Sequence, residues 1–196
     1  MPIISPASTL PHRPRRVLVA GNSGAGKTTL AARIAEEMGH PTEHVEIDSL
    51  FHGSNWEPRS TFVEDVEAFS RGRTWVTEWS YTSVLGRMLT DRADLVVWLD
   101  LPRWQVTCQV LYRTLKRRLP YPQQLWNGNV EPPLRTFFTD PEHVARYAIV
   151  HHPQKRRKFL RMADNRPELT IVRLDSHRKA ESWLSTTFRD SITGDA

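Results

Sequence analysis

The sequence predicts an α/β domain in which a parallel sheet lies between two layers of helices. Three observations predict this fold. Short apolar runs alternate with helix-like stretches along the chain, the run Leu95-Val96-Val97-Trp98-Leu99 is apolar throughout, and a glycine-rich loop joins the first clear strand to the first helix. A wholly apolar strand is typical of a parallel sheet that is covered on both faces. With 196 residues, the chain has the length of one domain or of a domain with a lid.

The expected elements follow one another in order. Strands are expected at residues 16–20, 45–47, 75–77, 95–99 and 169–174. Helices are expected at 28–38, at 61–72, as a short helix through Leu85 and Met88, at 102–119, at 141–161 and from Ser176 onward. Gly39 and Pro41 end the first helix, and Pro153 disturbs the fifth. The proline-rich residues 120–139 predict a loop. We expect residues 1–14, which contain four prolines, to be a disordered leader before a domain spanning 15–196.

Residues 20–30 read AGNSGAGKTTL and match the pattern G-x-x-x-x-G-K-[ST] between a strand and a helix. Glycines let successive backbone N–H groups point into one concavity at the positive end of the following helix, which suits a polyphosphate. We expect Lys27 to reach the β- and γ-phosphates and Thr28 to ligate Mg²⁺. The loop predicted to bind nucleotide consists of Gly21, Asn22, Ser23, Gly24, Ala25, Gly26, Lys27, Thr28 and Thr29.

Three acidic residues also stand at the carboxyl ends of predicted strands, where an α/β sheet binds its ligands. Asp48 is expected to orient or deprotonate an acceptor hydroxyl, the alternative being a turn-forming residue. Glu78 is expected to hold a Mg²⁺-bound water, the alternative being a salt-bridged edge residue. Asp100 is either a second group for that water or a cap for the following helix.

Positive charge is concentrated in one segment. Residues 103–161 carry 12 Lys and Arg against 3 Asp and Glu, whereas the net charge of the whole chain is +5. Such a segment favours an anionic partner or solvent. The cluster at 155–158 is compatible with a plain surface or with a nucleic-acid contact, and Arg87 is a further candidate for the acceptor.

Seven tryptophans are present. Trp75 and Trp98 lie in predicted strands and are expected in the core. Trp56, Trp79 and Trp126 lie in loops, where they either pack or stack on an acceptor base.

The order of these pieces resembles the adenylate-kinase-like P-loop kinases, and more narrowly the DNA topology modulation proteins. The resemblance rests on GNSGAGKTT at 21–29, EIDSLF at 46–51, WVTEWSY at 75–81, VVWLDLPRW at 96–104 and VRLDS with SWL within 172–184. It implies a three-layer P-loop NTPase fold with five parallel strands in the order 2-3-1-4-5, ATP·Mg²⁺ on the loop, and an arginine-bearing lid over residues 118–150. It also implies that Arg113 and Arg117 contact adenine and the transferred phosphate. Relatives commonly have Asp-Gly where this chain has Glu78-Trp79.

Two functions are therefore compatible with the sequence. The first is a P-loop kinase that transfers phosphate from ATP, with Mg²⁺, to a nucleotide, a nucleoside or a related hydroxyl compound. The alternative is a nucleotide-dependent nucleic-acid-binding or regulatory protein; for the kinase, we expect only weak and non-specific nucleic-acid binding. A single cysteine, Cys108, and the absence of an apolar run of about 20 residues fit a cytoplasmic protein without a membrane partner.

Overall fold

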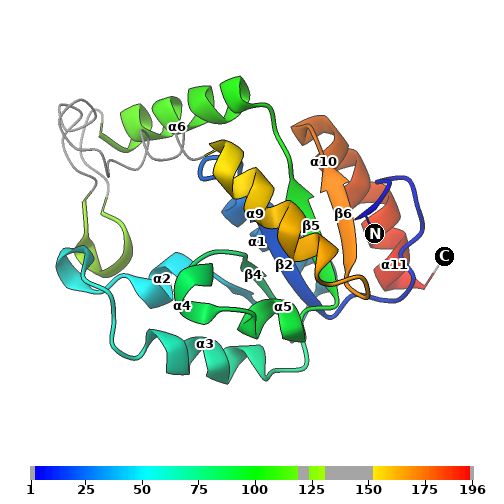
Figure 1. The fold of residues 1–196 in the computed structure, drawn as a ribbon, viewed down its shortest axis with the longest axis horizontal. Helices are drawn as coiled ribbons and strands as arrows, with labels where there is room; N and C mark the ends of the chain where they lie inside the picture. Colours follow the sequence, from blue (N-terminus) through cyan, green and yellow to red (C-terminus); the bar gives the residue numbers. More distant parts are fainter. Residues whose placement is uncertain (1–2, 119–123, 131–151, 195–196) are drawn as a thin grey trace.

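The computed structural model describes residues 3–118, 124–130 and 152–194, and its centre is a twisted sheet of six strands (Figure 1). The strands are β1 (Ile3–Ile4), β2 (Arg16–Gly21), β3 (His44–Val45), β4 (Trp75–Glu78), β5 (Leu95–Leu99) and β6 (Thr170–Leu174). They lie in the order β1-β6-β5-β2-β4-β3, and every pairing is parallel. The α/β class and the parallel sheet are thus as expected.

The N-terminal segment differs from two expectations, the number of strands and the disordered leader. The sheet has six strands instead of five, because Ile3 and Ile4 pair with Ile171 and Val172 and add β1 outside β6. The full order differs from the expected one by this added edge, while β3, β4, β2, β5 and β6 remain successive neighbours. Residues 3–14 are therefore not a disordered leader. The Pro6 carbonyl accepts a hydrogen bond of 2.9 Å from Thr187 Oγ1, and Leu10 is buried in the core.

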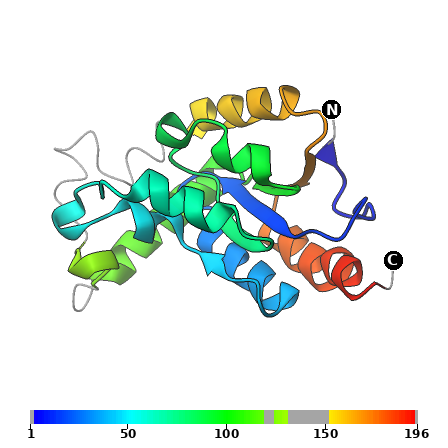
Figure 2. The same cartoon turned by 90° about the horizontal axis from the view of Figure 1, so that it is seen from below.

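Helices cover both faces of the sheet (Figure 2). They are α1 (Lys27–Met38), α2 (Ile47–Phe51), η1 (Ser54–Trp56), α3 (Phe62–Ser70), α4 (Thr82–Leu85), α5 (Met88–Arg92), α6 (Arg103–Arg118), η2 (Trp126–Gly128), α9 (His152–Asp164), α10 (His177–Trp183), the π-helical η3 (Leu184–Phe188) and α11 (Arg189–Thr193). Residues of α1, α6, α10, η3 and α11 pack on one face, and residues of α2, α3, α4, α5 and α9 on the other.

Alternation along the strands produces these two cores. In β2, Val17 and Val19 join the α1 side, whereas Leu18 and Ala20 join the α9 side. Side chains of successive strand residues point to opposite faces, so a strand buried on both sides needs apolar residues throughout. Trp75 and Trp98 lie in the core as expected, at 2% and 3% exposure.

Several boundaries differ from the expected ones. The second strand ends at Val45, and the next residues turn into α2, so Asp48 lies in a short helix and not at a strand end. The single short helix expected through Leu85 and Met88 is two helices, because Gly86 adopts a positive φ of 55° between α4 and α5. Most of the expected lid at 118–150 lies outside the described residues, apart from the end of α6 and residues 124–130. No helix in the described ranges is long and apolar enough to cross a bilayer.

Candidate active site at the carboxyl edge of the sheet

The phosphate-binding loop forms the expected turn between β2 and α1. Gly24 and Gly26 have φ angles of 84° and 88°, which favour glycine, and the Ala25 N–H donates to the Asn22 carbonyl at 3.1 Å. Lys27 Nζ donates to the same carbonyl at 3.3 Å. Burial lowers the pKa of Lys27, while the nearby Asp48 and Glu78 carboxylates act to raise it and Arg113 to lower it. The loop therefore places a partly desolvated ammonium group beside two carboxylates.

Glu78 lies beside Thr28 at the start of α1. The Glu78 carboxylate pairs with His44 Nε2 at 3.0 Å and accepts the Ile47 N–H at 3.1 Å. Burial acts to raise its pKa, but hydrogen bonds from His44, Ile47 and Thr28 outweigh burial and hold the pKa below its usual value. Glu78 is thus an ionised carboxylate next to the Thr28 hydroxyl. The described residues contain no group of three or more His, Cys, Asp and Glu side chains that would hold a metal by themselves.

Asp48 faces the phosphate-binding loop from α2 and is held by a residue that sequence reasoning missed. The Tyr81 hydroxyl donates to Asp48 Oδ1 at 2.7 Å and also contacts His52 Nε2 at 3.2 Å. The Tyr81 ring stacks on Phe51 with 4.0 Å between centroids. Burial and the Asp48 carboxylate raise the pKa of Tyr81 well above its usual range, so it remains a hydrogen-bond donor. Tyr81 also adopts a φ of 52°, a costly conformation for a bulky residue.

The structure describes only one of the two arginine side chains that the resemblance assigns to the helix after the fourth expected strand. Arg113 lies in α6 close enough to Lys27 to lower the pKa of that lysine. Arg117 lies one turn further along α6, and its side chain is outside the described part of the chain. The structure therefore brings Arg113 to the loop.

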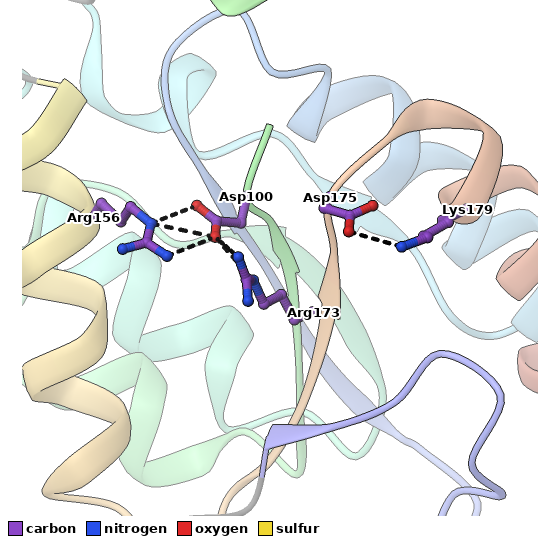
Figure 3. Close-up of polar contacts among 5 residues, drawn as sticks. All are labelled: Asp100, Arg156, Arg173, Asp175 and Lys179. Atoms are coloured by element: carbon purple, nitrogen blue, oxygen red, sulfur yellow. Dashed lines mark hydrogen bonds and ion pairs between the residues drawn. The ribbon is translucent and has the colours of Figure 1, made fainter. Parts of the chain in front are cut away.

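Asp100 has a role that neither sequence alternative foresaw. It directly follows β5 and is clamped between Arg156 of α9, with a contact of 3.0 Å, and Arg173 of β6, with a contact of 2.7 Å (Figure 3). Both guanidinium groups also lie over the ring of Trp98, at 5.7 and 5.4 Å from its centroid. Asp100 thus ties α9 to two neighbouring strands.

The basic cluster at 155–158 is turned partly inward. Lys155 Nζ donates to Ser23 Oγ of the phosphate-binding loop at 3.2 Å, and Arg156 binds Asp100. Burial and the Lys27 ammonium lower the pKa of Lys155 to about 8. A charge run gives no sign of which members face inward, so sequence reasoning left this cluster undecided.

A pocket of about 250 Å³ lies beside the phosphate-binding loop, between α1, α6 and α10. In it, Gln109 Nε2 lies 2.5 Å from His177 Nε2, and Arg33 pairs with Glu181. Neither Gln109 nor His177 was singled out from the sequence, although His177 directly follows Ser176, the predicted cap of the last helix. The pocket is lined by Gly24, Gly26, Thr29, Leu30, Arg33, Leu99, Gln109, His177, Ala180 and Glu181.

Trp56 and Trp126 join the segment around η1 to the segment around η2. Trp126 Nε1 donates to Glu46 at 2.9 Å, and Trp56 Nε1 donates to the Val130 carbonyl at 3.2 Å. The Trp126 ring also stacks on His52, with 5.8 Å between the centroids. Residues 124–130 therefore lie against the segment that follows Asp48. Arg87 instead pairs with Asp91 on the surface, with 72% of its side chain exposed.

Comparisons with known proteins agree with this fold. The Zeta toxin family model matches residues 5–49, which include β2, the phosphate-binding loop, α1 and β3. A gluconokinase from Sinorhizobium meliloti 1021 is similar over 94% of this chain and 99% of its own, with a TM-score of 0.50 and 18% sequence identity. A shikimate kinase from Bacteroides thetaiotaomicron covers 88% of this chain and 95% of its own, with a TM-score of 0.49 and 14% identity. No curated protein gives a significant match.

These likenesses concern the fold. The chain shares the α/β fold of this gluconokinase, and its own glycine-rich loop joins β2 to α1. The narrower resemblance to DNA topology modulation proteins stays a prediction.

Proposed function

We propose that this protein is a kinase that transfers the γ-phosphoryl group of ATP to a hydroxyl group of a small molecule. The observation that carries the proposal is that Lys27, Glu78 and Asp48 converge at one edge of the sheet. There, both carboxylates lie close enough to the Lys27 ammonium to favour its charged form. Phosphoryl transfer requires little beyond a positioned phosphate, neutralising charge and an oriented nucleophile. These residues offer the elements of such a site.

On the donor side, the nucleotide would lie along the phosphate-binding loop. The backbone N–H groups from Gly21 to Thr28 and the N-terminus of α1 suit the phosphates. The pocket beside Gln109 and His177 is continuous with Gly24 and Gly26 of the loop, and it suits the base or sugar. In this position ATP would present its γ-phosphate toward Lys27 and Arg113.

Thr28 and Glu78 fit a magnesium ion that is bound together with the nucleotide. Mg²⁺ usually takes one or two protein oxygens and fills its other positions with water and phosphate oxygens. The Thr28 hydroxyl and the ionised Glu78 carboxylate, which contact one another, offer this donor set. When bound, the ion would neutralise charge on the β- and γ-phosphates.

On the acceptor side, Asp48 is the group proposed to accept the proton of the attacking hydroxyl. The Tyr81 hydroxyl occupies Oδ1 and thereby fixes the carboxylate orientation. The acceptor oxygen would bond to the γ-phosphorus as the bond to the bridging oxygen breaks, releasing ADP and the phosphorylated product. Lys27 and Arg113 would stabilise the charge on the transferred group.

The nucleic-acid alternative is less well supported. It relied on the basic segment, but Lys155 and Arg156 contact the protein's own Ser23 and Asp100. A protein that grips nucleic acid with this helix would present these cations to solvent.

The test is ADP release by the purified protein with ATP and Mg²⁺ over a panel of nucleosides, nucleotides and small polyhydroxy compounds. Gluconate belongs in the panel because the protein of similar fold is titled a gluconokinase. We expect at least one acceptor to raise ADP release above the rate without acceptor, and Lys27→Ala to abolish the increase. Lys116→Ala, which removes an exposed charge from α6, is the matched control. A wild-type protein that does not bind ATP in calorimetry would contradict the proposal.

A further inference from the structure

We infer that Lys155 is a second lysine for the γ-phosphate of the nucleoside triphosphate, and that Asp100 and Arg173 position it through Arg156. This inference rests on the proposed function and adds to it a phosphate-contacting residue and the device that places it. Three observations support it. Lys155 contacts the phosphate-binding loop, it lies between Lys27 and Asp48, and the ion pairs of Asp100 with Arg156 and Arg173 fix its helix.

The contact is with the phosphate-binding loop itself. Lys155 Nζ lies 3.2 Å from Ser23 Oγ, the third residue of the G-x-x-x-x-G-K pattern. Lys155 stands in the first turn of α9, and Ser23 precedes α1 by a few residues. Two segments separated by 132 positions are thus joined at the loop that would cradle phosphate.

Lys155 lies between the groups proposed for the phosphate donor and those proposed for the acceptor. The charges that act on Lys155 include Lys27 on the donor side and Asp48 on the acceptor side. Arg113 in turn acts on Lys27. Three cations in a half-buried space repel one another, and a polyanion bound there would convert this repulsion into attraction. The γ-phosphate is the part of ATP that passes from the Lys27 side toward Asp48.

The clamp fixes the helix that carries Lys155. The neighbouring residue Arg156 contacts both oxygens of Asp100, and Arg173 holds the same carboxylate from β6 (Figure 3). Phe159, one turn further along α9, stacks on Trp98 with 4.3 Å between ring centroids. A carboxylate bound by two guanidinium groups has a defined orientation. The start of α9 therefore has a fixed register relative to β5, and Lys155 faces the loop.

The simpler explanation is that Lys155 only adds positive charge near an anion site. Lys158 separates the two explanations, since it is exposed on the same helix and also acts electrostatically on Lys155. A general charge effect would be shared by both lysines and would weaken ATP and ADP binding by similar factors. A direct contact with the γ-phosphate would be specific to Lys155 and to ATP.

The experiment measures the dissociation constants of ATP and ADP, each with Mg²⁺, by calorimetry on the full chain without acceptor. For Lys155→Gln we expect ATP binding to weaken by about tenfold or more, the size of one lost charge-assisted hydrogen bond, and ADP binding to change by less than about threefold. Lys158→Gln should alter both constants by less than about threefold. Equal weakening of ATP and ADP binding by Lys155→Gln, or equal effects of the two lysine variants, would overturn the assignment. Failure of the wild-type chain to bind ATP would instead refute the proposed function.

The positioning role has its own readout, the ratio of the ATP and ADP dissociation constants. Asp100→Asn should shift this ratio in the same direction as Lys155→Gln, and the two changes combined should shift it no further than Lys155→Gln alone. If Asp100→Asn does not fold, Arg156→Gln tests the same clamp, because the Arg156 side chain is 41% exposed. An unchanged ratio in a folded clamp variant, or additive shifts in the double variant, would overturn the positioning role.

Discussion

Gly24 allows the phosphate-binding loop to pack so closely against α6 that no side chain fits between them. Its φ of 84° disfavours any side chain, and a Cβ built on it would overlap Val110 Cγ2 and lie 3.4 Å from the Val106 carbonyl oxygen. Val110 is fully buried, and a valine in a helix has essentially one favourable rotamer, so it has little freedom to withdraw. Gly24→Ala therefore combines backbone strain with overpacking.

The two contributions can be separated by a matched variant. Gly194 has a similar φ of 87° and lies in the left-handed region, but a Cβ there meets nothing within 4 Å. We expect Gly194→Ala to lower the free energy of unfolding by about 1 kcal/mol from strain alone. Gly24→Ala should lower it by about 2 to 4 kcal/mol, since overpacking adds about 1 to 3 kcal/mol.

Urea denaturation followed by circular dichroism measures both variants. The double variant Gly24→Ala/Val110→Ala should be less destabilised than the sum of its single variants, by about 1 kcal/mol or more, because the smaller residue removes the overlap. Equal destabilisation by Gly24→Ala and Gly194→Ala, or strict additivity in the double variant, would refute the close approach of α6 to the loop.

The remaining predictions concern chemistry at the loop. Lys27→Ala should reduce turnover to less than about a tenth while leaving the unfolding midpoint near that of wild type, since a loop lysine contributes little to the core; turnover assays and thermal unfolding check this. Asp48→Asn should keep the ATP dissociation constant but lower kcat by a factor of about 10² or more, as expected for a lost base or orienting group; unchanged kcat in a folded variant would reduce Asp48 to a structural residue. Tyr81→Phe should lower kcat by a smaller factor than Asp48→Asn, because it frees the carboxylate without removing it; steady-state kinetics of the two variants give the comparison. ATP affinity should fall as pH rises through about 8, where Lys155 loses its proton, because the bound phosphate favours the charged ammonium. This part of the pH profile should be missing from Lys155→Gln, which retains Lys27, and its persistence there would assign the titration elsewhere.

Some parts of the site follow from the sequence because their cause is local or topological. The phosphate-binding loop is a contiguous pattern whose glycines adopt positive φ angles, so its turn between β2 and α1 was predictable from the sequence. Nucleotide binding by residues 21–29 stays a prediction. Glu78 was predictable near Thr28 because parallel strands end at a common edge. The same argument placed Asp48 at that edge, although it lies in α2 instead of at a strand end.

Other parts depend on tertiary contacts that leave no pattern along the chain. β1 has two residues, too few to show any alternation, and it exists because β6 offers a free edge. Asp100 appeared as a strand-end carboxylate, but its two partners lie 56 and 73 positions away. Tyr81 and Lys155 are polar residues among similar neighbours, and only the packing of α2, α4 and α9 decides that they face the site.

Both outer strands of the sheet have consequences for how copies of the protein behave at high concentration. β1 and β3 are each two residues long, whereas the four strands between them have four to six residues. A long bare edge strand is a template on which another molecule adds its own strand, and very short edges are one way in which proteins avoid such aggregation. The Ile3–Ile4 pairing thus shields the longer β6 from self-association. Removal of the first four residues would leave the backbone edge at Ile171 and Val172 open to such pairing.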